Sequence, residues 1–504
     1  MKIAFVAFGD ENPGVEYLSN YLKRNGHQVE LVFNPLQFHK SYIASDFLSK
    51  FFNWEEVNLQ ELEKINPDLV SFSCVTATYQ DSLKFAKKVK ARIRKPIIFG
   101  GVHPTLKPEV VMENEEVDMV CVGEGEEAIL ELMDSLQKGE KRTDIKNIWF
   151  RYDGQIIRNE VRSLEENLDK YEMDRLLFFR KLPSNYRRSP YFMASRGCPF
   201  NCTYCGNEQK RKVYAGKGKY LRQAGVDKTI VELKKLKKYG AKRILFVDDV
   251  LTVDKKWFTE FIKKYRKEIR LPFVCFIHPN LFDEELAYFL KKGGCQLVWF
   301  GIQSGSEEIR KKVLARFESN DDIKKAALLC HRFRLKFMVD HIFDIPFDND
   351  IIESLRLYND IRPSMINGYN LLYFPSSKII DHAIEAGIVK QEDLQMIDRG
   401  QSIIYQTGAL SAKSENVRDN YGKYALFMTM IPVLPKKIAG KIIESEKGLE
   451  RFSHLPLFLV PFVKLFLNFR IGYGFIPFAV INTEIFWIKE YMMIKLRNRF
   501  SKEK

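Results

Sequence analysis

The amino-acid sequence predicts an α/β protein, with a doubly wound parallel sheet followed by a partial barrel and then by a helical C-terminal region. Short apolar runs alternate with amphipathic helical patterns from residue 1 to about 395, which is the spacing of βαβ units. Three cysteines share one short loop in the middle of this pattern. No Asp or Glu occurs between residues 451 and 483, which sets the C-terminal region apart.

Length and charge fit a globular protein of several domains. A chain of 504 residues, 45% of them hydrophobic, allows roughly two to four domains. The net charge is +15, but many basic residues alternate with acids on predicted helices, as on solvated helix faces. We find no nucleic-acid-binding motif and expect no nucleic acid partner. Nothing resembles a secretory signal, so we expect a cytoplasmic protein without disulfides.

Residues 1–140 are predicted to form the first, Rossmann-like unit. The predicted strands are Ile3–Phe8, Val29–Val32, Leu69–Phe72, Ile97–Phe99 and Met119–Val122, and helical periodicity covers Val15–Asn25, Tyr79–Arg92 and Glu124–Gln137. Ligands of open α/β sheets bind beyond the carboxyl ends of the strands. The residues that follow these strands, and are therefore candidates for ligand binding, are Ser73, Thr76, Gly100, Gly101 and Gly123.

Residues 141–188 are predicted to link this unit to the next, with a small hairpin that turns at Asp153-Gly154. Residues 189–395 are predicted to form a partial (β/α)6, TIM-like barrel. Its candidate strands are Tyr191–Ala194, Arg243–Val247, Phe273–Ile277, Leu297–Phe300, Phe337–Phe343 and Gly368–Tyr373. The conspicuous loops follow these strands, at the catalytic rim of a βα barrel.

The three clustered cysteines are Cys198, Cys202 and Cys205, in the spacing C-x3-C-x2-C. Three thiolates on one loop can hold three corners of a 4Fe–4S cluster and leave the fourth iron open to a small molecule. A structural zinc site normally has four protein ligands. The other five cysteines are scattered singly in apolar contexts, where a free cysteine packs as a small hydrophobic residue. The cluster is therefore the favoured interpretation.

Residues 193–208, MASRGCPFNCTYCGNE, resemble the signature of radical S-adenosylmethionine (SAM) enzymes, in which the open iron binds SAM. Further matches follow in order. Residues 246–249 resemble the end of the second barrel strand of the cobalamin-using branch, and residues 300–306 resemble its GIESGS element, with Gln303 in place of the common Glu. Residues 340–346 resemble the fifth-strand segment, with Phe347 in place of the usual glycine. The resemblance implies that Tyr204, Asp248, Gln303 and Ser304 contact SAM.

The N-terminal loops are similar to the cobalamin-binding domain that precedes the barrel in many enzymes of this branch. The resemblance implies that the Ser73–Thr76 and Gly100–Gly101 loops surround the nucleotide tail of cobalamin, and Gly123 is a further candidate for cofactor binding. The cobalt-ligating pattern D-x-H-x-x-G is missing, because the comparable loop 9–14 has no histidine. We expect no cobalt ligand from this loop, and we interpret His103 as part of the loop architecture.

The resemblance implies methylation of an unactivated carbon or phosphorus centre by a deoxyadenosyl radical and methylcobalamin. The alternative is a radical cyclase, oxidase or rearrangement enzyme, like the anaerobic magnesium-protoporphyrin cyclase. A remote alternative is a cobalamin or cluster sensor without turnover. A flavodoxin or ferredoxin is expected as electron donor. Asp248, Asp249, His278 and His341 lie near predicted strand ends, but we assign no acid–base role to any of them.

The C-terminal region, residues 396–504, is predicted to be helical. No apolar run reaches the ~20 residues that span a bilayer. Two interpretations remain open for residues 451–500: an anchor that lies on the inner face of an anionic membrane, or a helical lid whose apolar face packs against the barrel. The apolar character makes a lipid or a tetrapyrrole a plausible substrate.

Overall fold

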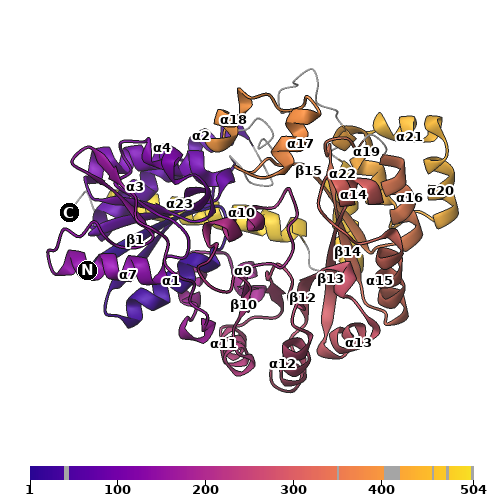
Figure 1. Ribbon diagram of the computed structural model, residues 1–504, viewed down its shortest axis with the longest axis horizontal. Helices are drawn as coiled ribbons and strands as arrows, with labels where there is room; N and C mark the ends of the chain where they lie inside the picture. Colours follow the sequence, from indigo (N-terminus) through magenta and orange to yellow (C-terminus); the bar gives the residue numbers. More distant parts are fainter. Residues whose placement is uncertain (39–44, 349–350, 402–419, 457–458, 473–475, 501–504) are drawn as a thin grey trace.

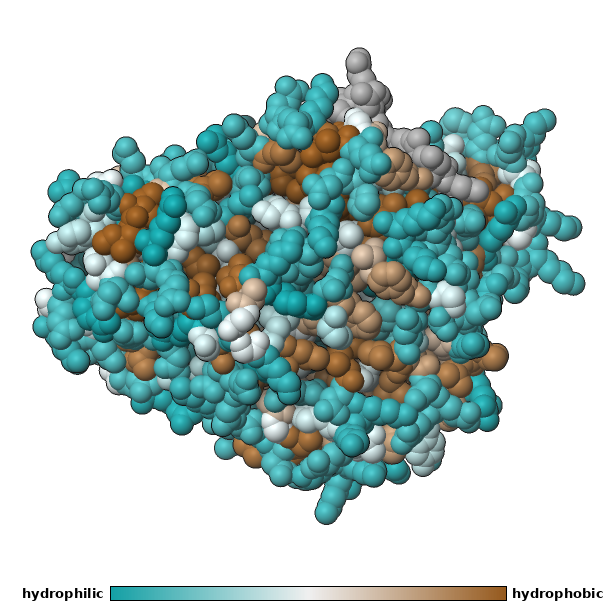
Figure 2. Space-filling model, in the orientation of Figure 1, coloured by the Kyte–Doolittle hydropathy of each residue, from teal (hydrophilic) through white to brown (hydrophobic). Residues whose placement is uncertain are grey.

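The computed structural model describes residues 1–38, 45–348, 351–401, 420–456, 459–472 and 476–500. Figure 1 shows the N-terminal sheet unit on the left and the barrel on the right, with α17 (Ile379–Glu385) and α18 (Asp393–Asp398) above the space between them. Figure 2 shows that the same face is largely hydrophilic, with separate apolar patches. Part of the predicted helical C-terminal region, residues 402–419, lies outside the described residues.

The first sheet has seven strands in the order β2-β1-β3-β4-β5-β6-β7. The first five are parallel. β1, β3, β4 and β5 are buried almost throughout, which explains their apolar sequences, whereas Gln28 and Glu30 of the edge strand β2 are exposed. Their bounds are β1 Lys2–Phe8, β2 Gln28–Asn34, β3 Leu69–Ser73, β4 Ile97–Gly100 and β5 Met119–Cys121. The helices of this unit are α1 Pro13–Arg24, α2 Asp46–Phe51, α3 Trp54–Ile65, α4 Thr76–Ile93, α5 Val102–Leu106, α6 Pro108–Met112 and α7 Glu126–Gln137.

The predicted hairpin forms, but it is part of the first sheet. β6 (Ile148–Tyr152) pairs antiparallel with β5, and β7 (Gln155–Ile157) forms the edge. Asp153 and Gly154 both have positive φ, 47° and 75°, as a two-residue hairpin turn requires. The connection to the barrel then contains η1 Leu168–Lys170, α8 Arg175–Phe179 and α9 Ser184–Arg188.

The barrel sheet has six parallel strands in the order β15-β14-β13-β12-β11-β8. Their bounds are β8 Tyr191–Phe192, β11 Ile244–Phe246, β12 Phe273–Ile277, β13 Cys295–Gln303, β14 Phe337–Phe343 and β15 Met365–Asn370. The last strand begins three residues before the prediction, because Met365 and Ile366 belong to the buried core. The barrel helices are α11 Val226–Lys238, α12 Lys255–Glu268, α13 Glu284–Gly293, α14 Glu307–Lys312, α15 Asn320–Arg332 and α16 Ile351–Ile361, with the turn η2 at Pro279–Leu281.

An antiparallel ribbon not foreseen from the sequence pairs β9 (Ser195–Arg196) with β10 (Arg222–Gln223). It encloses the cysteine loop and α10 (Gly206–Val213). Two-residue strands carry too little periodicity to be recognised in a sequence. The ribbon lies between the two sheets and, as described below, carries arginines that contact the first unit.

The C-terminal helices are distributed over both units. They are α19 Asn420–Met430, α20 Lys436–Ile443, α21 Glu446–Ser453, α22 Leu459–Ile471 and α23 Ile476–Phe500. α22 packs on the barrel strands through Leu467 and Ile471. α23 packs on the first unit, where Trp487 stacks on Phe33 of β2 at a centroid distance of 5.4 Å. The interpretation as a lid on the barrel therefore holds for the buried face of α22, whereas α23 packs on the first unit instead. None of the described helices is long and apolar enough to cross a membrane.

Candidate functional site

The cysteine loop runs from β9 to α10, and its entry needs a glycine. Gly197 has φ 90°, and a Cβ there would lie 2.5 Å from the carbonyl oxygen of Tyr220. All three cysteines are free; Cys202 is buried, and Cys198 and Cys205 are half-buried. Burial raises the pKa of the Cys198 thiol to about 12, and the neighbouring Asp249 and the other two thiols act in the same direction. A cationic metal centre would offset these effects and stabilise the thiolates.

The donor set therefore fits an iron–sulfur cluster chemically: three free thiols on one loop, close enough to influence one another's charge. Among the described residues, no three His, Cys, Asp or Glu side chains are already gathered as a metal site. The thiols would have to turn toward a common centre when the cluster is bound.

A buried arginine lies directly behind this loop. Arg316 Nη1 is 3.6 Å from Cys202 Sγ and 3.4 Å from Tyr204 Oη. Its Nη2 donates to the Gly301 carbonyl, and its Nε donates to Glu318 Oε1 at 2.6 Å. The fork of the guanidinium thus ties the cysteine loop to the end of β13. The sequence did not indicate Arg316, because Cys202 and Tyr204, which it contacts, lie more than a hundred positions away along the chain.

His278 completes this layer as a neutral side chain. Its ring stacks on Phe200 of the cysteine loop, with centroids 3.9 Å apart. Its Nε2 lies 3.5 Å from Glu318 Oε2. Burial, with a contribution from Arg316, lowers the pKa of His278 to about 3. His278 therefore supports the cysteine loop by stacking on Phe200, and its ring is uncharged at neutral pH.

The segment predicted to contact SAM ends β13 in an irregular turn. Gln303 has φ 72°, and the pairing with β14 shifts register between Gly301 and Gln303. Ser304 is fully buried, and its Oγ donates to Asp348 Oδ2 at 2.9 Å. Phe347, where the resembled segment has glycine, keeps the left-handed backbone with φ 64°. A left-handed backbone is unusual for a side chain as bulky as phenylalanine.

Asp248 joins the ends of two barrel strands. Its Oδ1 accepts hydrogen bonds from Ala194 N at 2.9 Å and from the Ser195 hydroxyl. Its Oδ2 is buried and has no hydrogen-bond partner within the described part of the chain. Burial raises the pKa of this carboxyl group to about 6. Asp248 thus fixes the strand that leads into the cysteine loop and keeps one oxygen available.

The candidate residues of the first unit meet at the carboxyl edge of its sheet. A Cβ on Gly101, which has φ 104°, would lie 2.5 Å from the Cys74 carbonyl oxygen. Gly123 N donates to Thr105 Oγ1 at 2.9 Å, and Ser73 Oγ accepts from Asn12 Nδ2 at 3.1 Å. The two glycines thus allow neighbouring groups to pack closely on this edge: the Cys74 backbone lies against Gly101, and the Tyr214 hydroxyl group lies against Gly123.

Thr76 and His103 form the deeper part of this edge. His103 is fully buried, its Nδ1 lies 3.3 Å from Thr76 Oγ1, and its ring stacks on Tyr79 at 4.1 Å. Its Nε2 has no hydrogen-bond partner among the described residues, and burial lowers its pKa to about 4. A Cβ on Gly400, just after α18, would lie 3.0 Å from the Thr76 carbonyl oxygen. The end of α18 therefore covers this edge.

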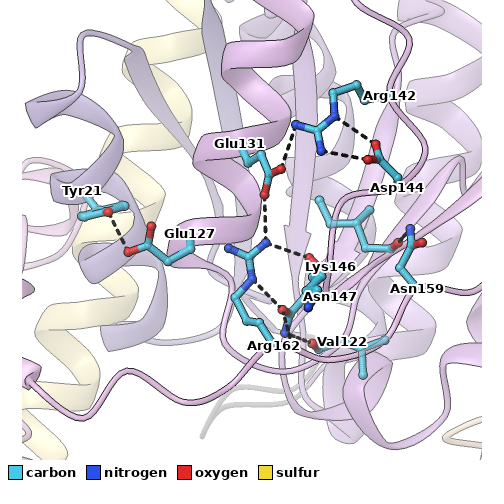
Figure 3. A network of polar contacts seen from close by, with 11 residues as sticks. Tyr21, Val122, Glu127, Glu131, Arg142, Asp144, Lys146, Asn147, Asn159 and Arg162 are labelled. Atoms are coloured by element: carbon cyan, nitrogen blue, oxygen red, sulfur yellow. Dashed lines mark hydrogen bonds and ion pairs between the residues drawn. The ribbon is translucent and has the colours of Figure 1, made fainter. Parts of the chain in front are cut away.

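The Gly123 loop is held by the polar network of Figure 3. Asn147, fully buried, donates to the Val122 carbonyl at 2.7 Å and accepts from Arg162 Nε at 2.9 Å. Arg162 also contacts Glu131 of α7 at 3.0 Å. The network anchors the end of β5 from behind, and it was not expected from the sequence.

The loop 9–14 turns its acidic side chains toward the connection between the units. Glu11 and Glu16 both contact Arg175, at 3.2 and 2.7 Å, and all three side chains are buried. Asp10 Oδ2 accepts from the Tyr191 hydroxyl at 3.0 Å. The place of the cobalt-ligating loop is thus taken by an ionic joint between the units.

The two candidate sites adjoin each other. α10, which follows Cys205, packs against α5, which follows Gly101. Arg196 of the ribbon contacts Glu124 at 3.0 Å and Glu126 at 2.6 Å, and Arg222 also contacts Glu124. The loops at the carboxyl ends of both sheets therefore face one common interface.

Two domain models match the chain in the same order. A model described as B12 binding domain matches residues 6–133, and one described as Radical SAM superfamily matches residues 193–357. The chain therefore contains a B12-binding domain followed by a radical SAM domain. The predicted cofactors, cobalamin and SAM with its 4Fe–4S cluster, are confirmed at the level of these two domains.

Relatives of this chain include an uncharacterized methyltransferase of Pyrococcus horikoshii, 29% identical over 62% of this chain and 66% of the relative. The anaerobic magnesium-protoporphyrin IX monomethyl ester cyclase of Rubrivivax gelatinosus is 24% identical over 70% of this chain and 62% of the cyclase. The alignments thus span less than two thirds of these relatives. The structure of the cobalamin-dependent SAM radical enzyme OxsB with aqua-cobalamin bound shares the fold, with 14% identity, a TM-score of 0.65, and coverage of 99% of this chain and 80% of OxsB.

Proposed function

We propose that this protein is a cobalamin-dependent radical SAM methyltransferase that acts on an unactivated carbon or phosphorus centre. The main support is the interface where the cysteine loop and α10 meet the Gly101 and Gly123 edge. When bound there, the cluster and SAM would supply radical chemistry and cobalamin would supply the methyl carrier. The methyltransferase among the relatives favours this activity over others of the fold.

The chain's own residues would bind and orient these groups. Cys198, Cys202 and Cys205 would hold the cluster, while Arg316 would fix the loop through its contact with Cys202. Tyr204, Asp248, Gln303 and Ser304 would line the SAM site. The remaining proposed ligand residues would hold cobalamin on the first sheet: Ser73, Thr76, Gly100, Gly101 and Gly123.

We expect no cobalt ligand from loop 9–14, since its acids are engaged by Arg175 and Tyr191. His103 is stacked on Tyr79 and faces Thr76, which supports its interpretation as loop architecture. Electron paramagnetic resonance of the Co(II) form tests this. Absence of nitrogen coupling is the expected result, and nitrogen coupling that disappears in His103→Phe would contradict it.

Product analysis after anaerobic reconstitution separates the proposed activity from its alternatives. Methylated product with S-adenosylhomocysteine and 5′-deoxyadenosine is the expected result. Deoxyadenosine without S-adenosylhomocysteine would instead indicate the cyclase or rearrangement class, which the cyclase relative supports. Bound cofactors without either product would indicate a sensor. Reduced flavodoxin and ferredoxin serve as electron donors in the same assay.

We also propose peripheral contact with an anionic membrane through α22. Phe462, Phe466 and Phe469 recur at i, i+4 and i+7 on this helix, and 63%, 56% and 70% of their surfaces are exposed. All charged residues between 451 and 483 are basic. Apolar stripes beside basic residues bind anionic lipid surfaces.

Vesicle flotation tests this contact. The full chain should float with vesicles that contain phosphatidylserine, and replacement of the three phenylalanines by serine should abolish flotation. Leu328→Ser on α15, which removes a side chain with 67% exposure, is the matched control. Equal flotation of both variants, or no flotation of the unaltered chain, would contradict the proposal.

A further inference from the structure

The segment that carries the cysteine loop is fastened to one residue of the first unit, Glu124, which lies between β5 and α7. Arg196 begins this segment in β9, Tyr214 follows α10, and Arg222 ends the segment in β10. All three side chains contact Glu124. Residues 196–222 are therefore attached to the first unit on both sides of the cysteine loop.

The carboxylate of Glu124 is shared by two arginines. Its Oε2 lies 3.0 Å from Arg196 Nη1 and 3.1 Å from Arg222 Nη1, and its Oε1 accepts from Arg222 Nη2. Arg222 thus binds both oxygens, an arrangement that fixes direction as well as distance. Burial opposes ionisation of this carboxyl group, but Arg196 and Arg222 outweigh burial and lower the pKa of Glu124. The carboxylate is therefore charged at neutral pH.

The main chain of Glu124 is held as well. Its N–H donates to Tyr214 Oη at 2.5 Å, and the Tyr214 side chain is buried. A Cβ on the preceding Gly123 would collide with the same hydroxyl oxygen. Glycine at this position therefore lets Tyr214 reach the main chain of the loop.

The two arginines are themselves fixed. The guanidinium carbon of Arg196 lies 4.9 Å from the ring centroid of Tyr17 and 5.2 Å from that of Tyr171, within the range of cation–π contacts. Arg222 is buried and also donates to the Glu165 carbonyl at 2.7 Å. Because neither guanidinium is free to turn, both hold the Glu124 carboxylate in one place.

We propose that Glu124 is a positioning residue, which fixes the cysteine loop relative to the Gly123 edge and so sets how the bound cluster and the bound cobalamin face each other. Glu124 follows a candidate cobalamin-binding residue, and its partners flank the cysteines that are proposed to hold the cluster. This inference rests on the proposed function, because methyl transfer requires the two cofactors to be oriented closely.

Pulsed electron paramagnetic resonance tests the placement directly. In protein loaded with Co(II) cobalamin and a reduced cluster, it measures the distance between the two unpaired spins. The unaltered protein should give one narrow distribution of distances. Glu124→Gln keeps the size of the side chain but removes the charge that both arginines bind, so the distribution should become broader or longer.

Glu127→Gln is the matched control. Glu127 lies in the first turn of α7, and its side chain is 31% exposed, against 27% for Glu124. Its carboxylate contacts Tyr21 at 2.7 Å and Lys170 instead of the cysteine segment. This variant should keep the distribution of the unaltered protein.

Tyr214→Phe is the second test variant. It removes the acceptor of the Glu124 N–H group and leaves every charge in place. It should change the distribution in the same direction as Glu124→Gln, by a smaller amount. Iron and cobalamin are quantified in each variant, and Tyr214→Phe decides the test if Glu124→Gln fails to retain a cofactor.

The two products of SAM give an independent measurement. S-adenosylhomocysteine forms only where SAM and cobalamin meet, whereas deoxyadenosine requires SAM and the cluster alone. Glu124→Gln should lower the formation of S-adenosylhomocysteine roughly 10- to 100-fold, since a misplacement of about 1 Å can cost about 100-fold. Formation of deoxyadenosine should stay unchanged.

Unchanged distance distributions in both Glu124→Gln and Tyr214→Phe would overturn the inference. So would an equal change in Glu127→Gln, or a parallel loss of both products in Glu124→Gln, because either would indicate a general disturbance. If the unaltered protein forms no S-adenosylhomocysteine, the proposed function fails, and the distance measurement still decides the role of Glu124.

Discussion

The two sheets end in loops of opposite character. At the edge of the first sheet, Ser73, Gly101 and Gly123 expose backbone and small side chains, and a Cβ on Gly101 would collide with Cys74. At the barrel rim, Cys202 faces the buried Arg316–Glu318 pair. The first edge lets neighbouring protein groups pack directly on its glycines. The second concentrates buried charge, which suits a small and highly polar ligand.

The largest expected effect is the loss of the cluster site in the barrel, with the first sheet unaffected. Cys202→Ala should abolish cluster assembly and all SAM cleavage, because three thiolates are the minimum for this cluster type. Cobalamin binding should persist, since no cysteine of the loop belongs to the first sheet. Iron content, cluster absorbance and cobalamin retention measure these outcomes. Cys330→Ala, which alters a buried core cysteine, is the control and should keep its cluster.

The joint between the two regions should be the most sensitive site for stability. Arg175→Met leaves the buried Glu11 and Glu16 carboxylates without their cation and should lower the free energy of unfolding by about 3–5 kcal/mol. Denaturant titration of the full chain measures the loss. A midpoint unchanged from that of the unaltered protein would show that the joint does not stabilise the fold.

The same joint predicts a pH dependence. Burial raises the pKa of Glu16 well above 4.5, and that of Glu11 is raised as well. A raised carboxyl pKa favours the protonated form in the folded state. The contribution of such a group to the free energy of unfolding is therefore complete below about pH 4.5 and is lost as pH rises through the folded-state pKa. Glu16→Gln should remove part of this loss of stability with rising pH. Unfolding curves measured between pH 5 and pH 8 compare the two proteins; identical slopes would contradict the prediction.

An intermediate effect is expected when the buried charge at the barrel rim is altered. Arg316→Lys keeps a cation but loses the fork that joins Cys202, Gly301 and Glu318. SAM affinity should fall roughly 10- to 100-fold, as is usual for residues that support a metal site. The SAM-induced change of the cluster's paramagnetic resonance spectrum measures this at unchanged iron content. An unaltered SAM titration would exclude such a role.

The smallest expected effect concerns the first edge. Gly101→Ala should weaken cobalamin binding while leaving the cluster intact, since its Cβ meets the Cys74 backbone and its backbone conformation, φ 104° and ψ −167°, disfavours a side chain by roughly 1–3 kcal/mol. Gly139→Ala is a matched control, because Gly139 has φ 72° but open space around it. Spectroscopic cobalamin titration compares them. Equal weakening in both variants would assign the effect to backbone strain alone.

Local features of the sequence were sufficient to predict both sheets, their strand order in the chain, and the loops that follow the strands. Continuous apolar runs bounded by Gly and Asn indicate buried parallel strands, and the cysteine spacing is contained within eight residues. The hairpin turn at Asp153-Gly154 was also predictable, but its membership of the first sheet was not. The sequence of a hairpin does not indicate which strand of a sheet the hairpin will pair with.

The sequence by itself therefore determined the elements, the cysteine loop and the glycines at the strand ends, because periodicity, spacing and backbone freedom act over a few residues. Only the tertiary structure decided that Arg316 meets Cys202, that α23 packs on the first unit, and that Leu467 and Ile471 of α22 pack on the barrel strands. These contacts join residues more than a hundred positions apart. They depend on how the elements pack, and packing selects partners by shape and burial that no local pattern specifies.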